Sequence, residues 1–154
     1  MKGGFYVVNV FDVANYILKN TGQTTSMKLQ KLVYYSQAWS LAWDDAPLFD
    51  DDFQAWANGP VCPELFKKHK GHFSLPIDFF EKDSTGVLST NQCETIDVVL
   101  EEYGAMAPHE LSDLTHREYP WIQARGDTPP GMPCENIIEK EVMRDYYAGL
   151  VSAV

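Results

Sequence analysis

The sequence has few basic residues and no long apolar run, and each shortage excludes a class of protein. Lysine and arginine number 12 against 22 aspartates and glutamates, so the formal net charge is -10. A surface with this charge repels phosphate backbones and anionic lipid, and we expect neither nucleic acid nor a membrane as a partner. No apolar stretch approaches the roughly 20 residues that cross a bilayer, and Met1 to Phe11 lack the pattern of a secretion signal. We therefore expect a cytoplasmic protein.

Recognisable signs of catalysis are also lacking. Three cysteines are too few and too widely spaced for a disulfide framework or a zinc ribbon. The sequence contains no Walker-type loop and no G-x-S-x-G, G-x-G-x-x-G or H-E-x-x-H motif. We predict that the chain is not an enzyme and binds no metal or cofactor. A hydrolase that uses Cys62 with a histidine is the alternative that the sequence leaves open.

Apolar residues, in contrast, are abundant enough to form a core. Hydrophobic side chains make up 45 % of the 154 residues, and a chain of this length suits one domain, 1–154, without a fused DNA-binding domain. The most apolar helix is predicted over residues 27–43, where apolar residues lie on most sides, as in a helix surrounded by others. Amphipathic patterns predict the remaining helices near residues 12–21, 63–70, 89–103, 108–114 and 138–150. The predicted class is α+β, mainly α, with five or six helices in a single compact domain around the central one.

A small antiparallel β-hairpin is predicted after the central helix. Residues 46–49 and 53–57 flank three consecutive aspartates, a pattern typical of two short strands joined by an acidic turn. The sequence Asn58-Gly59-Pro60 predicts a second turn before the next helix. Residues 72–88 show no periodicity and are predicted to form a long surface loop.

Three segments together resemble the SocA-like antitoxin family, whose domain is called Panacea and whose members are bacterial or carried by prophages. The stretch from Lys28 to Gln37, K-L-Q-K-L-x-Y-Y-x-Q, is similar to the family's helix signature. Phe53 to Leu65 is similar to its second signature, a strand followed by a G-P-V turn into a helix, and Leu111 to Trp121 is similar to a third. The resemblance implies an antitoxin that neutralises a cognate toxin by direct binding. Some family members act instead as adaptors that deliver the toxin to an ATP-dependent protease.

Lys28, Gln30 and Lys31 form the first group of candidate partner-binding residues. They are polar or basic in an otherwise apolar helix of an acidic protein. One lysine falls on the apolar face of this helix. These residues therefore either form an internal ion pair with a carboxylate, which would fix the fold, or contact the partner.

The second candidate group is Trp56, Asn58, Gly59 and Pro60. These residues lie at a predicted turn, and interaction residues often lie on such connections. An exposed tryptophan is a typical hot spot of a protein interface, but Trp56 can equally be a core residue.

Other conspicuous residues have simpler structural interpretations. Cys62 precedes a helix, where backbone N–H groups can activate a thiol, but a small buried residue is the favoured interpretation. His116 is expected to be hydrogen-bonded near Trp121. The aspartates at 44–45 and 50–52 lack the spacing of a calcium loop and are interpreted as a solvated acidic rim.

Overall fold

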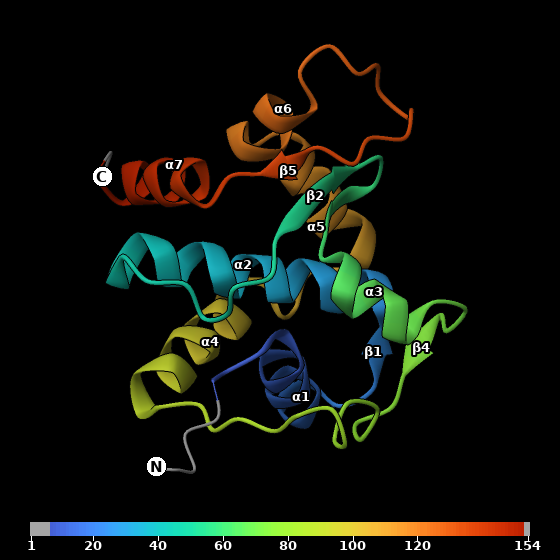
Figure 1. Ribbon diagram of the computed structural model, residues 1–154, viewed down its shortest axis with the longest axis vertical. Helices are drawn as coiled ribbons and strands as arrows, with labels where there is room; N and C mark the ends of the chain where they lie inside the picture. The colour runs from blue at the N-terminus through green and yellow to red at the C-terminus, as the bar shows by residue number, and fades with distance from the viewer. Residues whose placement is uncertain (1–6, 153–154) are drawn as a thin grey trace.

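The computed structural model describes residues 7–152, whose elements are arranged around one central helix (Figure 1). The helices are α1 (Val10–Thr21), α2 (Ser26–Asp44), α3 (Pro63–His69), α4 (Thr90–Tyr103), α5 (Pro108–His116), α6 (Tyr119–Arg125) and α7 (Lys140–Ser152). The strands are β1 (Thr24–Thr25), β2 (Phe53–Trp56), β3 (Gly59–Val61), β4 (Ser74–Leu75) and β5 (Ile137–Ile138). The described chain is thus α+β and mainly α, as predicted, with seven helices instead of five or six. No helix among residues 7–152 is long and apolar enough to cross a membrane.

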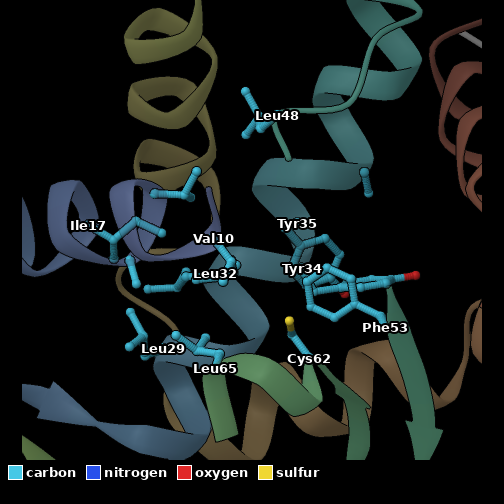
Figure 2. Close-up of a cluster of buried hydrophobic side chains, with 14 of the residues drawn as sticks. Val10, Ile17, Leu29, Leu32, Tyr34, Tyr35, Leu48, Phe53, Cys62 and Leu65 are labelled. Carbon is cyan, nitrogen blue, oxygen red and sulfur yellow. The ribbon is translucent and has the colours of Figure 1, made fainter. Parts of the chain in front are cut away.

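Helix α2 is the centre of the fold, as its apolar composition predicted. Helices α1, α4 and α7 all pack against it (Figure 1). Figure 2 shows how its side chains meet their neighbours: Leu32 lies near Val10 of α1, and Tyr34 faces Phe53 of β2. The rings of Tyr34 and Phe53 meet edge to face with their centroids 5.3 Å apart. Burial on nearly every side explains why this helix shows no single apolar stripe.

The β-hairpin lies one segment later in the chain than the sequence predicted. Strand β2 pairs antiparallel with β3, while residues 46–49 form no strand. The reason is the side chain of Gln37 in α2, which accepts a hydrogen bond from the backbone N–H of Leu48 at 2.7 Å and donates to the carbonyl of Phe49 at 2.8 Å. Because α2 satisfies these backbone groups, the segment needs no partner strand.

Three short strands and one short helix differ from the sequence prediction. Strand β4 lies inside the predicted loop 72–88 and pairs with β1, with Thr24 opposite Leu75. Strand β5 pairs with the free side of β2, so Ile138 is a strand residue and the last helix begins at Lys140. Helix α6 was not predicted as a helix. Elements this short are too brief to show a periodic pattern in the sequence.

Candidate functional site

A cleft of about 580 Å³ opens beside the N-terminal half of α2. Three segments form its walls: the first turns of α2, the β2–β3 turn with α3, and the loop at 131–135. Most of its lining is apolar and comes from Met27, Trp56, Val61, Phe66 and Pro133. The polar groups are those of Ser26, Gln30, Lys31, Asn58, His69 and Glu135. A mostly apolar cleft with a few polar groups is typical of a binding site.

The β2–β3 turn, residues 55–60, is held by side chains that bind its backbone, and we call it the pinned turn. Four of these hydrogen bonds are Arg125 to the carbonyl of Ala55 at 2.9 Å, the Trp121 indole to Trp56 at 2.9 Å, the Ser112 hydroxyl to Asn58 at 2.5 Å, and the Lys31 ammonium to Pro60 at 3.2 Å. His116 also hydrogen-bonds to the backbone, at Ala57. Helices α2, α5 and α6 therefore hold this turn as a fixed platform at the cleft.

Glycine at position 59 is required by both the conformation and the crowding of the pinned turn. Its φ is +119°, a value that residues with a Cβ rarely adopt. A Cβ at this position would lie 2.6 Å from Cε of Lys31 and 2.8 Å from Oγ1 of Thr115. Gly59 and the buried Pro60 thus lie directly against the side chain of Lys31.

Lys31 is buried without a negative partner, which corrects the ion-pair hypothesis. Its side chain is only 1 % exposed, and none of the ion pairs among residues 7–152 includes Lys31 or Lys28. Its one hydrogen-bond acceptor within that range is the carbonyl of Pro60. Burial penalises the charged form, and the pKa of Lys31 is therefore lowered to about 8. The lining of the cleft thus includes a buried lysine whose charge no carboxylate balances.

Gln30 connects α2 to the start of α3. Its amide oxygen accepts the backbone N–H of Cys62 at 2.9 Å, and its amide nitrogen lies 3.3 Å from the carbonyl of the same residue and 3.0 Å from Nε2 of His69. The amide donates in this arrangement, so Nε2 of His69 is the acceptor and the ring is neutral. Burial lowers the pKa of His69 and favours the same neutral form.

Cys62 is a buried residue at the start of α3, as its favoured interpretation predicted. It is fully buried, and burial raises its pKa to about 12. Burial therefore outweighs the helix N-terminus, and the Cys62 thiol is held in its protonated form. Across residues 7–152, no three His, Cys, Asp or Glu side chains are grouped to hold a metal ion.

His116 and Trp121 lie together, as predicted, and support the pinned turn from α5 and α6. Their rings stack with centroids 4.2 Å apart. Nε2 of His116 is buried without a hydrogen-bond partner, and burial lowers the pKa of this histidine. A neutral ring stacked on an indole suits a structural role.

The structure separates the predicted partner-binding residues into three groups. Gln30, Lys31, Trp56 and Asn58 line the cleft, whereas Gly59 and Pro60 belong to the pinned turn and are not among the lining residues. Lys28 faces a different hollow between α2 and α4, where its ammonium donates to the carbonyl of Gly104 at 2.6 Å. Whether these residues bind a partner stays a prediction.

One wall of the cleft was missed by sequence reasoning. The wall at 131–135 is attached through Arg125, whose guanidinium donates to the carbonyls of Pro129 at 2.9 Å and Met132 at 2.7 Å. The same guanidinium binds the pinned turn at Ala55. In the sequence, the only signal was the Pro/Gly-rich composition of residues 126–133, which indicates a connector and not a binding wall.

Comparison with protein families gives one match. A family model described as antitoxin SocA-like, Panacea domain, matches residues 29–122. Neither the curated proteins nor the solved structures gave a match. The matched range contains the pinned turn and its contacts from α2, α5 and the start of α6, but it ends before Arg125 and the wall at 131–135.

Proposed function

Since this chain belongs to the SocA-like antitoxin family that carries the Panacea domain, we propose that it neutralises a cognate toxin by binding it directly at the cleft beside the pinned turn. Family membership favours a binding role over a catalytic one. The observation that carries the choice of site is the cleft itself, whose lining is mostly apolar and whose turn is held on its inner side. Such a preorganised surface loses little freedom when a partner binds.

Exposed apolar side chains around the cleft extend this surface. Met27, in the cleft lining, is 39 % exposed, and Met132, which lies in the chain between the lining residues Gly131 and Pro133, is 53 % exposed. Phe73 is 81 % exposed, and its carbonyl accepts the backbone N–H of Ser26 at 2.9 Å, next to Met27. We call Met27, Trp56, Asn58, Phe73 and Met132 the docking surface. Apolar groups clustered at a cleft are typical of protein interaction sites.

Charge supports a protein partner of the opposite sign. The net charge of -10 would speed encounter with a basic toxin through long-range attraction. Once the two proteins meet, the apolar docking surface would supply most of the affinity, because a few buried aromatic residues usually dominate an interface. Trp56 is half-buried against Phe66, with ring centroids 4.9 Å apart, and is the expected hot spot.

Co-expression tests this proposal. The product of the neighbouring gene is expressed with and without this chain, and the wild-type chain should restore growth. Trp56→Ala should weaken binding roughly 30-fold or more, as expected for a hot spot. Trp43→Ala is the matched control, because Trp43 is 44 % exposed at the opposite end of α2. Equal effects of the two variants would place the interface elsewhere, and failure of the wild-type chain to rescue would overturn the proposed function.

Two further measurements complete the test of the proposed function. Met132→Glu alters an exposed residue of the docking surface, so it tests the interface without removing core packing. A reconstituted degradation assay with an ATP-dependent protease separates the two modes of neutralisation. Simple occlusion predicts that the bound toxin is protected, whereas an adaptor predicts faster loss of the toxin.

A further inference from the structure

Lys31, a buried residue in the lining of the cleft, carries a positive charge with unused hydrogen-bonding capacity. The ammonium of Lys31 has three N–H donors, and among residues 7–152 it has one acceptor, the carbonyl of Pro60. The other buried cation of this region, Arg125, differs because it donates to the carbonyls of Ala55, Pro129 and Met132. An unsatisfied buried donor costs free energy that a suitable ligand would recover.

The rest of the lining does not neutralise this charge. Gln30 is occupied by Cys62 and His69, and His69 is held neutral. Glu135 is the one carboxylate among the lining residues, and it is exposed and forms no ion pair with Lys31. Because most of the surrounding lining is apolar, an anion that entered the cleft would be attracted more strongly than in water.

We propose that the cleft binds a carboxylate carried on an apolar arm, supplied by an acidic side chain of the bound toxin, with the ammonium of Lys31 as its counter-ion. This inference rests on the proposed function. A carboxylate fits better than a phosphate group, because the lining offers a single cation and no arginine fork. The volume of about 580 Å³ has room for such an arm between Met27, Trp56 and Phe66.

The arrangement would also give specificity. The acidic surface of this chain repels acidic proteins in general. A toxin that is basic overall would be attracted to the acidic surface, and one carboxylate beside apolar residues on that toxin would pair with Lys31 in the cleft. A partner that lacks the carboxylate would leave the Lys31 ammonium buried without a counter-ion.

A pair of small probes tests the cleft chemistry on the full chain. The probes are 3-phenylpropionate and its neutral analogue 3-phenylpropionamide, and binding is followed by nuclear magnetic resonance at the indole N–H of Trp56. The acid should bind wild type roughly tenfold or more tightly than the amide, as expected for a hydrogen bond to a charged group. Lys31→Met should remove this preference, and its unfolding curve shows whether it is folded. No binding of the acid to wild type, equal binding of both probes, or a preference that survives Lys31→Met would each overturn the inference.

A second experiment uses the toxin identified by co-expression. Each exposed aspartate or glutamate of the toxin is changed to asparagine or glutamine. One change should weaken binding to wild type roughly tenfold and should have little effect on binding to Lys31→Met. If the chain rescues growth but no toxin carboxylate couples to Lys31, the inference is overturned and the proposed function stands. If the chain does not rescue growth, the proposed function is overturned, while the comparison of acid and amide still decides whether the cleft recognises carboxylates.

Discussion

Each half of α2 is associated with one buried charged group, and the two groups have different hydrogen-bond partners. Lys31, in the N-terminal half, has one carbonyl as its partner. Glu118, beside the C-terminal half, accepts hydrogen bonds from the hydroxyls of Tyr35 at 2.7 Å and Tyr147 at 2.8 Å. Burial shifts the pKa of each group toward its neutral form, upward for Glu118 and downward for Lys31. The carboxylate is satisfied within the fold, whereas the ammonium keeps donors free at a cleft.

Aromatic side chains pack closely at the C-terminal half of α2, beside the buried Glu118. At the C-terminal half, the rings of Tyr35 and Tyr103 stack with centroids 4.1 Å apart, and the Trp39 indole donates to the Tyr103 hydroxyl at 2.9 Å. Tyr147 of α7 completes this cluster, which joins α2, α4 and α7. We conclude that the C-terminal, aromatic half of α2 stabilises the fold, whereas the N-terminal half lines the cleft that we propose as the binding surface.

The largest effect on stability is expected when the aromatic ring of Tyr147 is removed. Tyr147→Ala should lower the free energy of unfolding by about 3–5 kcal/mol, because it leaves a large cavity in the core. Tyr147→Phe, the matched control, loses only the hydroxyl that binds Glu118 and should cost about 2 kcal/mol. Urea unfolding measures both. A loss below about 1 kcal/mol for Tyr147→Ala would show that the aromatic half isn't the main source of stability.

The second test follows the pH dependence of the buried ammonium. The folded-state pKa of Lys31 is about 8, below the ordinary value of 10.5, so the charged lysine destabilises the folded state. This penalty is complete well below pH 8 and disappears only above pH 10.5, where lysine becomes neutral in both states. The stability of wild type relative to Lys31→Met should therefore rise by roughly 3 kcal/mol across this interval. A difference that is flat or falls with pH would contradict a buried, unbalanced Lys31.

A third test addresses the contact between α2 and the pinned turn. Gly59→Ala should cost about 2 kcal/mol more than Gly71→Ala, because a Cβ at position 59 collides with Lys31 and Thr115 whereas a Cβ at position 71 meets open space. Both glycines have positive φ, +119° at Gly59 and +87° at Gly71, so both variants carry conformational strain. Thermal unfolding with matched buffers measures the difference. Equal losses would show that the lysine can move away from the turn.

The smallest effect is expected from Glu118. Its raised pKa means that its contribution to stability is fully present below its ordinary pKa of 4.5 and is lost as pH rises through the folded-state value. Wild type should therefore lose stability relative to Glu118→Gln as pH rises above 4.5. The effect is small because hydrogen bonds from Tyr35 and Tyr147 lower the pKa and partly offset burial. Unfolding at several pH values checks the sign, and a relative gain with pH would show that the hydroxyls outweigh burial.

Local signals in the sequence predicted the features that depend on neighbouring residues. The apolar composition of 27–43 predicted the buried central helix, and the amphipathic pattern of 89–103 predicted α4, which Ser89 and Gln92 cap in the structure. The sequence Asn58-Gly59-Pro60 correctly predicted a turn. It did not predict that this turn closes the hairpin, because the competing segment 46–49 is satisfied by Gln37 from the preceding helix.

The candidate site was less predictable, because its walls meet only through contacts between distant segments. Lys28, Gln30 and Lys31 stand out in the sequence of α2, but the partner of Lys31 is a backbone carbonyl and not a carboxylate. Carbonyl acceptors exist at every residue, so no sequence pattern marks the one that is used. The outer wall depends in the same way on Arg125, which binds carbonyls on both sides of the cleft.

The pinned turn also constrains when the protein can become active during its synthesis. Residues 55–60 leave the ribosome well before Ser112, Trp121 and Arg125, which bind their carbonyls. These long-range contacts form only after the helices that carry them have been made and have docked on α2. The cleft is therefore assembled late, and a nascent chain interrupted before Arg125 would have a central helix but no completed cleft.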